Sequence, residues 1–408
     1  MKIKILYIGL SIFLLSWIIP SLVQLTMDSS PRYPFTYYSS VINQFCYLDQ
    51  DNDNVRGKDM SGKVYSDAEF DRVLPMFYYR QLAMENAIPD SIQGVPVDRQ
   101  TIARNNFFFW YKPKDKNTPV IELYPMFESC SGKVDLENPS DMFRLKENIE
   151  FIDMTTNRVD EQKSTRFQQA MEKAGFTFPA LWVTGIPTSQ KSYDEGYFAL
   201  DSKGHLFHVK MTNGKPFVKD TKASNISCMF PMEIDNRSLY GFLFDTNHTL
   251  YYLSTDGYRL VKVLENVNPD KDRVSIMANM FYWTVAKISS DGEHTYALEN
   301  KSMRQVDSLF RPAPESTWDK TQPYLFPFTV TFQDSTNSYI YPRVSGYYFP
   351  SLLLNIILTI VTFVVYRKEK SYGKYLVGII TLFTGIAGFI TVCLFARIRK
   401  KITLNISS

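Results

Sequence analysis

Histidine is the side chain best suited to acid–base or metal chemistry at neutral pH, and this chain of 408 residues has only four. His205, His208, His248 and His294 all lie on or beside expected hairpin turns in one part of the sequence. If equivalent loops of successive repeats converge, these imidazoles could bind zinc or copper. The alternative is a set of ordinary surface histidines, because His205 and His208 point to opposite faces of a strand. We favour the alternative, and the sequence predicts no cofactor.

The motifs of the common catalytic sites do not occur in the sequence. There is no G-x-G-x-x-G, no H-E-x-x-H and no nucleophile elbow, and Ser131-Gly132-Lys133 lacks the other residues of a phosphate-binding loop. Asp49 begins a run that resembles a calcium loop, but Asn54 stands where glycine is needed and Met60 where glutamate is needed. We therefore assign no catalytic residue, and a protein that is not an enzyme is the favoured prediction.

Three uncharged apolar segments lie near the two ends of the sequence, and they would hold the central region at the membrane. Ile5–Leu25 is followed by no small-x-small cleavage site, which favours an uncleaved N-terminal anchor. About 20 apolar residues cross the core of a bilayer, so we predict three transmembrane helices. The predicted organisation is an anchor (1–26), a membrane-proximal α/β segment (27–105), a β-rich domain (106–346), a second span (347–366), a basic loop (367–374), a third span (375–396) and a basic tail (397–408).

The formal net charge of +3 hides an asymmetry along the chain. Lys2 and Lys4 precede the first apolar segment, and the stretch after Tyr366 holds eight Lys or Arg against one Glu. Subtracting these +2 and +7 contributions leaves −6 for the centre. A basic nucleic-acid-binding domain is therefore excluded, and the positive charge sits beside the apolar segments, as in membrane proteins.

The orientation in the membrane is predicted from these flanking charges. If residues 375–396 cross the bilayer, the basic loop 367–374 and the basic tail 397–408 lie on opposite sides, and one of them violates the positive-inside rule. The first helix usually dominates the orientation, and its lysines lie on its N-terminal side. We therefore predict a multi-pass protein of the cytoplasmic (inner) membrane with an extracytoplasmic central region.

One phrase recurs in the central region: an apolar run, a polar turn with aspartate, and another apolar run. The clearest copies are Phe198–Val209 and Phe242–Leu253. The aspartates of the copies stand at 38 to 48-residue intervals: Asp115, Asp153, Asp201, Asp245, Asp291 and Asp334. Hairpins that recur every 40 to 50 residues are typical of β-propeller blades. We predict a mainly β fold, a propeller-like array of five or six blades with a few helices, and a β-sandwich is the alternative.

Two helices are marked within this β-rich sequence. Ser66 begins a capping box, and Pro75 should divide the helix that follows it before it ends near Asn86. A second helix is predicted from a cap at Ser164 to a closing Gly175.

Two sets of residues are candidates for contact with a partner. Phe35, Tyr37 and Tyr38 are held near the membrane by the first span, and aromatic residues are favoured at protein interfaces. Thr381 and Gly385 form a small-x-x-x-small pair that lets two helices approach closely in lipid. The second pair predicts a helical partner, within the chain or outside it.

Three stretches, Pro34-Phe-Thr-Tyr-Tyr-Ser-Ser-Val-Ile42, Val73-Leu-Pro-Met-Phe-Tyr-Tyr-Arg-Gln-Leu82 and Ser164–Pro179, resemble an uncharacterised family of bacterial membrane proteins. Its members have one leading span and further spans at the end, and the resemblance covers nearly the whole chain. It implies an association with ABC-transporter permease and ATPase subunits, and it carries over no functional residue.

The function predicted from these observations is that of a membrane-anchored accessory or interaction protein with an extracytoplasmic β domain. Its partners would be the lipid bilayer and a membrane protein such as a transporter permease, in an ABC-type complex. The alternatives are an extracytoplasmic sensor of a ligand or metal, and an enzyme on a propeller scaffold.

Overall fold

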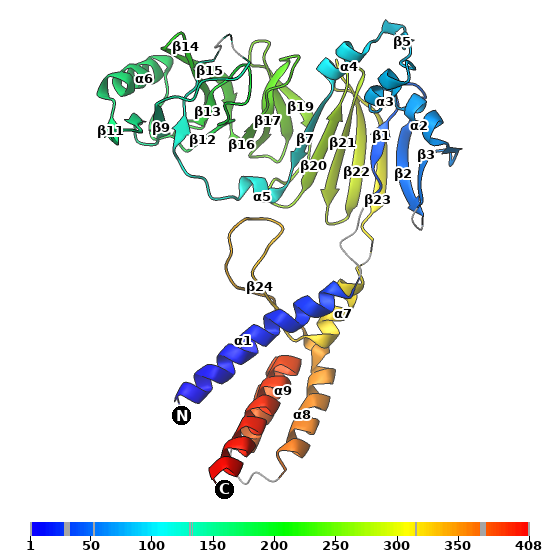
Figure 1. Ribbon diagram of the computed structural model, residues 1–408, viewed down its shortest axis with the longest axis vertical. Helices are drawn as coiled ribbons and strands as arrows, with labels where there is room; N and C mark the ends of the chain where they lie inside the picture. The colour runs from blue at the N-terminus through cyan, green and yellow to red at the C-terminus, as the bar shows by residue number, and fades with distance from the viewer. Residues whose placement is uncertain are drawn as a thin grey trace. The chain divides into compact units, whose positions relative to one another are not determined.

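The structure is a computed structural model that describes residues 2–27, 33–51, 54–129, 132, 134–314, 316–367 and 373–406. The chain forms two compact units, which are described separately (Figure 1). Pro34–Arg311 forms a β unit, and Met1–Tyr33 together with Pro312–Ser408 forms a helical unit.

The β unit is built from five antiparallel sheets, four with four strands and one with five. The first sheet contains β1 (Thr36–Tyr38), β2 (Phe45–Asp51), β3 (Asn54–Asp59) and β4 (Val64–Tyr65). The second contains β8 (Tyr124–Pro125), β9 (Asp141–Leu145), β10 (Ile149–Asp153) and β11 (Arg158–Val159). The third contains β12 (Trp182–Gly185), β13 (Tyr197–Leu200), β14 (His205–Thr212) and β15 (Lys215–Ser224).

The fourth sheet contains β16 (Ile226–Pro231), β17 (Leu239–Asp245), β18 (Leu250–Ser254) and β19 (Leu260–Leu264). The fifth contains β20 (Arg273–Ala278), β21 (Tyr282–Ser289), β22 (Gly292–Glu299) and β23 (Gln305–Pro312), and β7 (Phe107–Tyr111) joins it beside β20. Apart from β7, every sheet is thus a meander of consecutive strands, the arrangement found in a propeller blade.

The recurring aspartate closes hairpins, as the sequence predicts. The Asp201 carboxylate accepts hydrogen bonds from the backbone N–H groups of Lys203 (3.0 Å) and His205 (2.8 Å) between β13 and β14. The Asp245 carboxylate does the same between β17 and β18, at 2.9 and 2.8 Å. An aspartate that bonds its own following backbone in this way stabilises a tight turn.

The repeat prediction fails at its two ends. Asp115 lies in a short helix, α5 (Pro113–Lys116), and Asp334 lies in the helical unit. The first sheet contains no copy of the phrase and was not predicted as a repeat.

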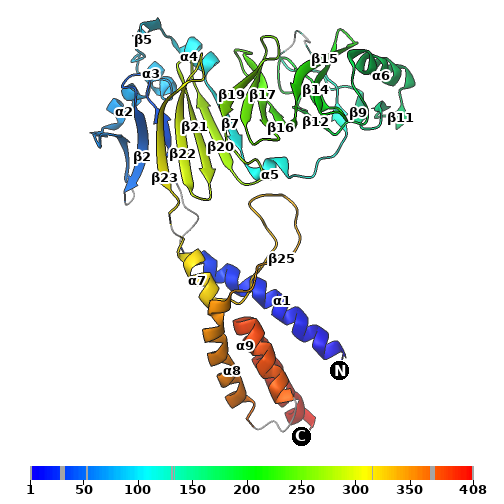
Figure 2. The ribbon, with the colours of Figure 1, turned by 180° about the vertical axis from the view of Figure 1, so that it is seen from behind.

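Neighbouring sheets share apolar cores, and this arranges them in a row. β13 shows how: Tyr197 and Ala199 face the β8–β11 sheet, whereas Phe198 and Leu200 face the β16–β19 sheet. Further cores join β16–β19 to the five-stranded sheet and that sheet to β1–β4. The β8–β11 and β1–β4 sheets lie at opposite ends of the row (Figures 1 and 2).

A closed propeller is therefore not formed, and this part of the prediction is wrong. Among the described residues, the β8–β11 and β1–β4 sheets each share an apolar core with one neighbouring sheet, so the row stays open. The observed architecture is mainly β, with several small sheets and some helices.

Both ends of the β unit meet at the β1–β4 end of the row. The Arg311 guanidinium donates to Thr36 Oγ1 (2.8 Å) and to the Glu293 carboxylate (2.9 Å). The third residue of the unit and its last residue are thus joined by a side-chain hydrogen bond.

The helices of the β unit are α2 (Asp67–Val73), α3 (Tyr79–Met84), α4 (Arg99–Asn105), α5 and α6 (Glu161–Ala174), beside a small hairpin of β5 (Ser91–Ile92) and β6 (Val95–Pro96). The capping box at Ser66 is present, and the chain around Pro75 separates α2 from α3, as predicted. Gly175 ends α6 with φ 95°, a conformation that glycine adopts most easily.

The start of α6 differs from the prediction. Asp160 caps the helix by accepting from the backbone N–H of Lys163 at 2.9 Å, four residues before the predicted cap. Ser164 is buried and instead accepts from the backbone N–H of Phe151 at 2.9 Å, so it fastens the helix to β10.

The helical unit contains α1 (Lys2–Leu25), α7 (Thr317–Leu325), a small hairpin of β24 (Val330–Thr331) and β25 (Arg343–Val344), the 3-10 turn η1 (Phe349–Ser351), α8 (Leu352–Val365) and α9 (Gly373–Ile406). By length and composition alone, two of its helical segments, Ile5–Leu25 and Lys374–Leu394, could cross a membrane, and the second contains a non-helical residue, Gly385.

The prediction of three such helices is corrected to two. The 14 residues of α8 extend about 21 Å at 1.5 Å per residue, which is short of a hydrocarbon core of about 30 Å. The apolar segment of the sequence is longer, but its first residues form η1 and the chain before it.

Candidate functional site

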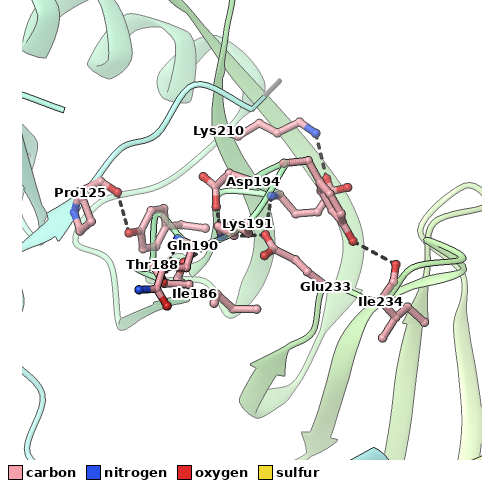
Figure 3. Close-up of polar contacts among 12 residues, drawn as sticks. Pro125, Ile186, Thr188, Gln190, Lys191, Asp194, Lys210, Glu233 and Ile234 are labelled. Carbon is pink, nitrogen blue, oxygen red and sulfur yellow. Dashed lines mark hydrogen bonds and ion pairs between the residues drawn. The ribbon is translucent and has the colours of Figure 1, made fainter. Parts of the chain in front are cut away.

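A buried ion cluster joins two sheets of the β unit (Figure 3). Lys191 lies in the connection between β12 and β13, and its ammonium contacts Asp194 Oδ1 at 2.5 Å and Glu233 Oε1 at 2.9 Å. It also donates to the carbonyl oxygen of Ile186 at 2.9 Å. Glu233 lies between β16 and β17, so the cluster fastens a loop of one sheet to a loop of the next.

The three side chains are almost fully withdrawn from solvent, with 10% of Lys191, 1% of Asp194 and 11% of Glu233 exposed. Burial raises the pKa of the Asp194 and Glu233 carboxyl groups, and the Lys191 ammonium opposes that rise in both. The cluster holds two carboxylates against one ammonium, and Asp194 Oδ2 has no hydrogen-bond partner among the described residues.

Perturbed ionisable groups are frequent at functional sites, but the geometry here favours a structural role. The Lys191 ammonium has three acceptors, which matches its three N–H donors. It therefore has no proton or lone pair to offer a substrate. The backbone N–H of Glu195 also donates to Glu233 Oε1 at 2.8 Å, which strengthens the same connection.

Further polar contacts surround the cluster (Figure 3). Lys210 pairs with Glu195 at 3.0 Å, and Tyr193 donates its hydroxyl proton to the carbonyl of Ile234 at 3.0 Å. The Arg237 guanidinium lies 3.7 Å from the centre of the Tyr193 ring, a cation–π contact. The two contacts of Tyr193 cross between the same two sheets and reinforce their junction, whereas the Lys210–Glu195 pair lies within one sheet.

His208 belongs to this junction and is fully buried on β14. Its Nε2 contacts the carbonyl oxygen of Glu195, and its Nδ1 lies 2.9 Å from the Tyr258 hydroxyl. A carbonyl only accepts, so this network assigns the proton to Nε2 and leaves Nδ1 to accept from Tyr258. Burial lowers the pKa of His208 to about 4, so the ring is neutral at physiological pH.

The four histidines are not brought together. The His205 side chain is half exposed at 4.0 Å from Asp201, and His294 contacts Asp291 at 2.9 Å. His248 is exposed in a turn, while both ring nitrogens of His208 are engaged. Within the described part of the chain, no group of three or more His, Cys, Asp or Glu side chains could hold a metal ion.

The aromatic residues proposed for a partner surface form part of the core instead. Tyr37 is 2% exposed and Tyr38 is 4% exposed, and Phe35 packs against the same core. Asn279 donates to the Tyr37 hydroxyl at 2.7 Å, and the backbone N–H of Tyr38 donates to Thr284 Oγ1 at 3.0 Å. β1 is therefore buried on both faces and does not offer an exposed surface: Tyr37 lies in the core around α2, and Tyr38 lies in the core shared with the five-stranded sheet.

The small-residue pair finds its partner within the chain. The Thr381 hydroxyl on α9 lies 3.3 Å from that of Thr362 on α8. Gly385 lies against Asn355 of α8, whose side-chain amide donates to the carbonyl of Leu382 at 3.0 Å. The pair therefore packs helices of the same unit.

A cleft of about 360 Å³ lies between the β16–β19 sheet and the five-stranded sheet. Tyr252 and Trp283 form its apolar wall, and Asn236, Asn300 and Asp256 supply polar groups. Trp283 Nε1 donates to Asn300 Oδ1 at 2.8 Å, which fixes both side chains. The lining thus combines aromatic rings with amide, hydroxyl and carboxylate groups.

The sequence match decides the family. The family described as "Domain of unknown function (DUF4857)" matches residues 35–298. The chain belongs to the DUF4857 family. The DUF4857 match begins just before β1 and ends within β22, so it includes strands of all five sheets of the β unit and leaves out β23.

Solved structures resemble the DUF4857 chain only distantly. A chain of the S. cerevisiae complex of Dbp5 with Nup159, Gle1, IP6 and ADP is 6% identical, with 52% of this chain and 79% of that chain covered and a TM-score of 0.20. The N-terminal domain of Nup159 is 8% identical, with coverage of 58% and 84% and a TM-score of 0.21. The β-propeller domain of Myceliophteria thermophila Cps50 (Swd1) is 7% identical, with coverage of 71% and 90% and a TM-score of 0.23. A search of curated proteins found no match.

Neither the ion cluster nor the cleft could be predicted from the sequence. Lys191 and Asp194 are close in sequence, but Glu233 follows them by about 40 residues in a different sheet. No spacing rule connects them, and the residues of the cleft are equally dispersed. Only the assembled sheets bring them together.

Proposed function

We propose that this DUF4857 protein is a membrane-anchored accessory protein, not an enzyme, whose β unit lies outside the cytoplasm and binds a partner protein of an ABC-type transport complex. The observation that carries the proposal is the apolar surface of the helical unit. Leu6, Leu22 and Leu25 of α1 are 69%, 58% and 81% exposed, and Leu353 of α8 is 71% exposed. Apolar surface of this extent is unfavourable in water and suited to lipid.

The ionisable groups of the β unit support a binding protein over an enzyme. Asp194 and Glu233 are held by Lys191, and His208 is held by Tyr258 and the Glu195 carbonyl. The contacts of Lys191 with Glu233 and of His208 with Tyr258 fasten one sheet to the next. A rigid row of sheets offers a long surface for a protein partner, as in other repeat architectures.

The test is purification of the tagged full-length chain from membranes. We expect the chain in the membrane fraction after alkaline carbonate extraction, and a permease and an ATPase recovered with it in mild detergent. Recovery of the chain alone would contradict the accessory role, and release by carbonate would contradict the anchoring.

The cleft favours a second candidate function, the binding of a small hydrogen-bonding ligand by the β unit. The test is thermal unfolding of the full-length chain in detergent with a panel of monosaccharides and amino acids. We expect one class to raise the Tm, and Asn236→Leu to reduce that rise, because Asn236 lines the cleft and hydrogen-bonds Asn105 at 3.3 Å. A panel without any shift would contradict this candidate.

A further inference from the structure

The second long apolar helix is folded back on itself. Gly385 has φ 57° and ψ −133°, which divides α9 into an arm before it and an arm after it. In a straight helix, Gly388 would lie about 12 Å along the axis from Ile380. A Cβ built on Gly388 would instead lie 3.2 Å from the carbonyl oxygen of Ile380. The second arm therefore returns alongside the first.

Contacts with α8 show the same reversal. Near the start of α8, Asn355 donates to the carbonyl of Leu382 at 3.0 Å. At its end, Tyr366 donates its hydroxyl proton to the carbonyl of Val392 at 2.8 Å. In a straight helix antiparallel to α8, the contact of Tyr366 would precede Leu382 in the chain. It follows Leu382, so the second arm runs in the same direction as α8.

The turn depends on a glycine. At φ 57° and ψ −133°, a side chain would be strained, and a Cβ on Gly385 would lie 2.6 Å from Asn355 Oδ1 and 2.9 Å from Pro327 Cδ. The hydroxyls of the first arm are satisfied locally, since Thr381 donates to the carbonyl of Val377 at 3.0 Å. The hairpin therefore closes tightly and exposes few polar groups.

This reversal changes where the basic residues lie. Figures 1 and 2 show both chain termini and the end of α8 at one end of the helical unit, whereas α1 ends and α7 begins at the other. The basic residues at the former end are Lys2, Lys4, Arg367, Lys374, Arg397, Arg399, Lys400 and Lys401. A straight third span would have divided this set between the two sides of the membrane.

We propose that α9 enters and leaves the bilayer on the same side, so that both termini and the α8–α9 connection face the cytoplasm. The occupant of the apolar surface is lipid, and the basic end faces the anionic headgroups of the cytoplasmic leaflet. The hairpin removes the conflict between basic loop and basic tail, because both now obey the positive-inside rule. The proposal rests on the membrane anchoring proposed above.

The second crossing is made by η1 and α8 together. α8 alone is too short, but the three residues of η1 extend it to the apolar helical segment Phe349–Val365, which reaches the lower limit of spanning length. The chain before the hairpin then crosses the membrane twice, through α1 and through this segment. The β unit therefore lies on the opposite side of the membrane from the two termini.

The test places three reporters in the full-length chain. An epitope tag is fused to each terminus, and Ser290→Cys, at an exposed position of the β unit, is labelled with an impermeant maleimide in a chain whose native cysteines are replaced. In intact spheroplasts we expect only position 290 to react, and both tags to be reached only after permeabilisation. Tags on opposite sides, or a β unit on the same side as both tags, would overturn the hairpin topology.

A variant tests the turn itself. Gly385→Leu should expose the C-terminal tag in at least part of the molecules, because a side chain there opposes the reversal. Gly9→Leu in α1, where no atom lies within 4 Å of a built Cβ, is the matched control and should leave both tags in place. An unchanged C-terminal tag in stably inserted Gly385→Leu would contradict the role of the turn. Absence of the wild-type chain from membranes would instead refute the anchoring itself.

Discussion

Replacing Lys191 with methionine should destabilise the junction between two sheets of the β unit. The substitution keeps the apolar stem of the side chain and removes the ammonium that contacts Asp194 and Glu233 at 2.5 and 2.9 Å. Both carboxylates are almost fully buried, so water cannot replace the lost cation. The variant therefore keeps two buried negative charges without compensation.

The size of the effect follows from the burial. Removal of one partner of a buried ion pair costs about 3–5 kcal/mol. For a chain unit of this size, about 1 kcal/mol lowers the Tm by roughly 2–4 °C, so the expected fall is roughly 6–20 °C near neutral pH. The exposed ion pair of Lys222 with Asp220 provides the control. Lys222 is 83% exposed, so Lys222→Met should lower the stability by at most about 1 kcal/mol.

The destabilisation should also depend on pH. Without Lys191, the pKa values of Asp194 and Glu233 rise further above their unfolded values, because the group that lowers them is gone. A raised carboxyl pKa gives stability that is present at low pH and is lost as the pH rises through the folded value. The difference from wild type should therefore shrink as the pH falls from 7.5 to 5.

The assay is thermal unfolding of the full-length chain in mild detergent, followed by near-ultraviolet circular dichroism at both pH values. Lys191→Met combined with Glu233→Gln should recover part of the loss, because one of the two uncompensated charges is removed. A Tm for Lys191→Met equal to that of Lys222→Met at pH 7.5, or a loss that grows in acid, would refute the reasoning.

Three further predictions rest on separate features. The pKa of His208 is lowered to about 4 in the folded protein, so between about pH 6.5 and 4 only the unfolded chain binds a proton at this residue. About 3 kcal/mol of folding stability should therefore be lost as the pH falls across that range. His208→Phe should reduce this pH dependence, as measured by denaturant unfolding at a series of pH values. Leu10 of α1 is 51% exposed, so Leu10→Arg should reduce membrane insertion in a carbonate-extraction assay while Leu10→Ala leaves it unchanged; equal insertion of both would argue against contact of this face with lipid. A Cβ on Gly57 would lie 2.3 Å from the Phe70 ring, so Gly57→Ala should lower the free energy of unfolding by about 1–3 kcal/mol, as measured with denaturant. Gly346→Ala is the control and should change it little, because no atom lies within 4 Å of a Cβ there.

Local turn chemistry was the part of the fold that could be predicted from the sequence. Asp201 and Asp245 organise their hairpins through bonds to backbone groups two and four residues on, so the signal lies within a few residues. The β1–β4 sheet was expected only as part of an α/β segment and not as a member of the row, because β1 has three residues, all buried, and shows no alternation of apolar and polar positions. Closure of the row depends on contacts between whole sheets, which leave no local signal.

The same distinction applies to the helical unit. Thr381 and Gly385 were identified as a pair that packs against another helix, and α8 is that helix. The reversal at Gly385 was not predicted, because an apolar sequence of this length reads as one span. It depends on Asn355 and Pro327, which lie far from Gly385 in the sequence and pack against it in the structure.

The hydrogen bond between Arg311 and Thr36 has a consequence for how the two units are connected. It joins the third residue of the β unit to its last residue, so the chain enters and leaves that unit at neighbouring points. The β unit therefore has the connectivity of a domain inserted into the helical unit between α1 and α7. A short linker could replace the module without separating the helices that flank it, and a different domain with adjacent ends could occupy its place.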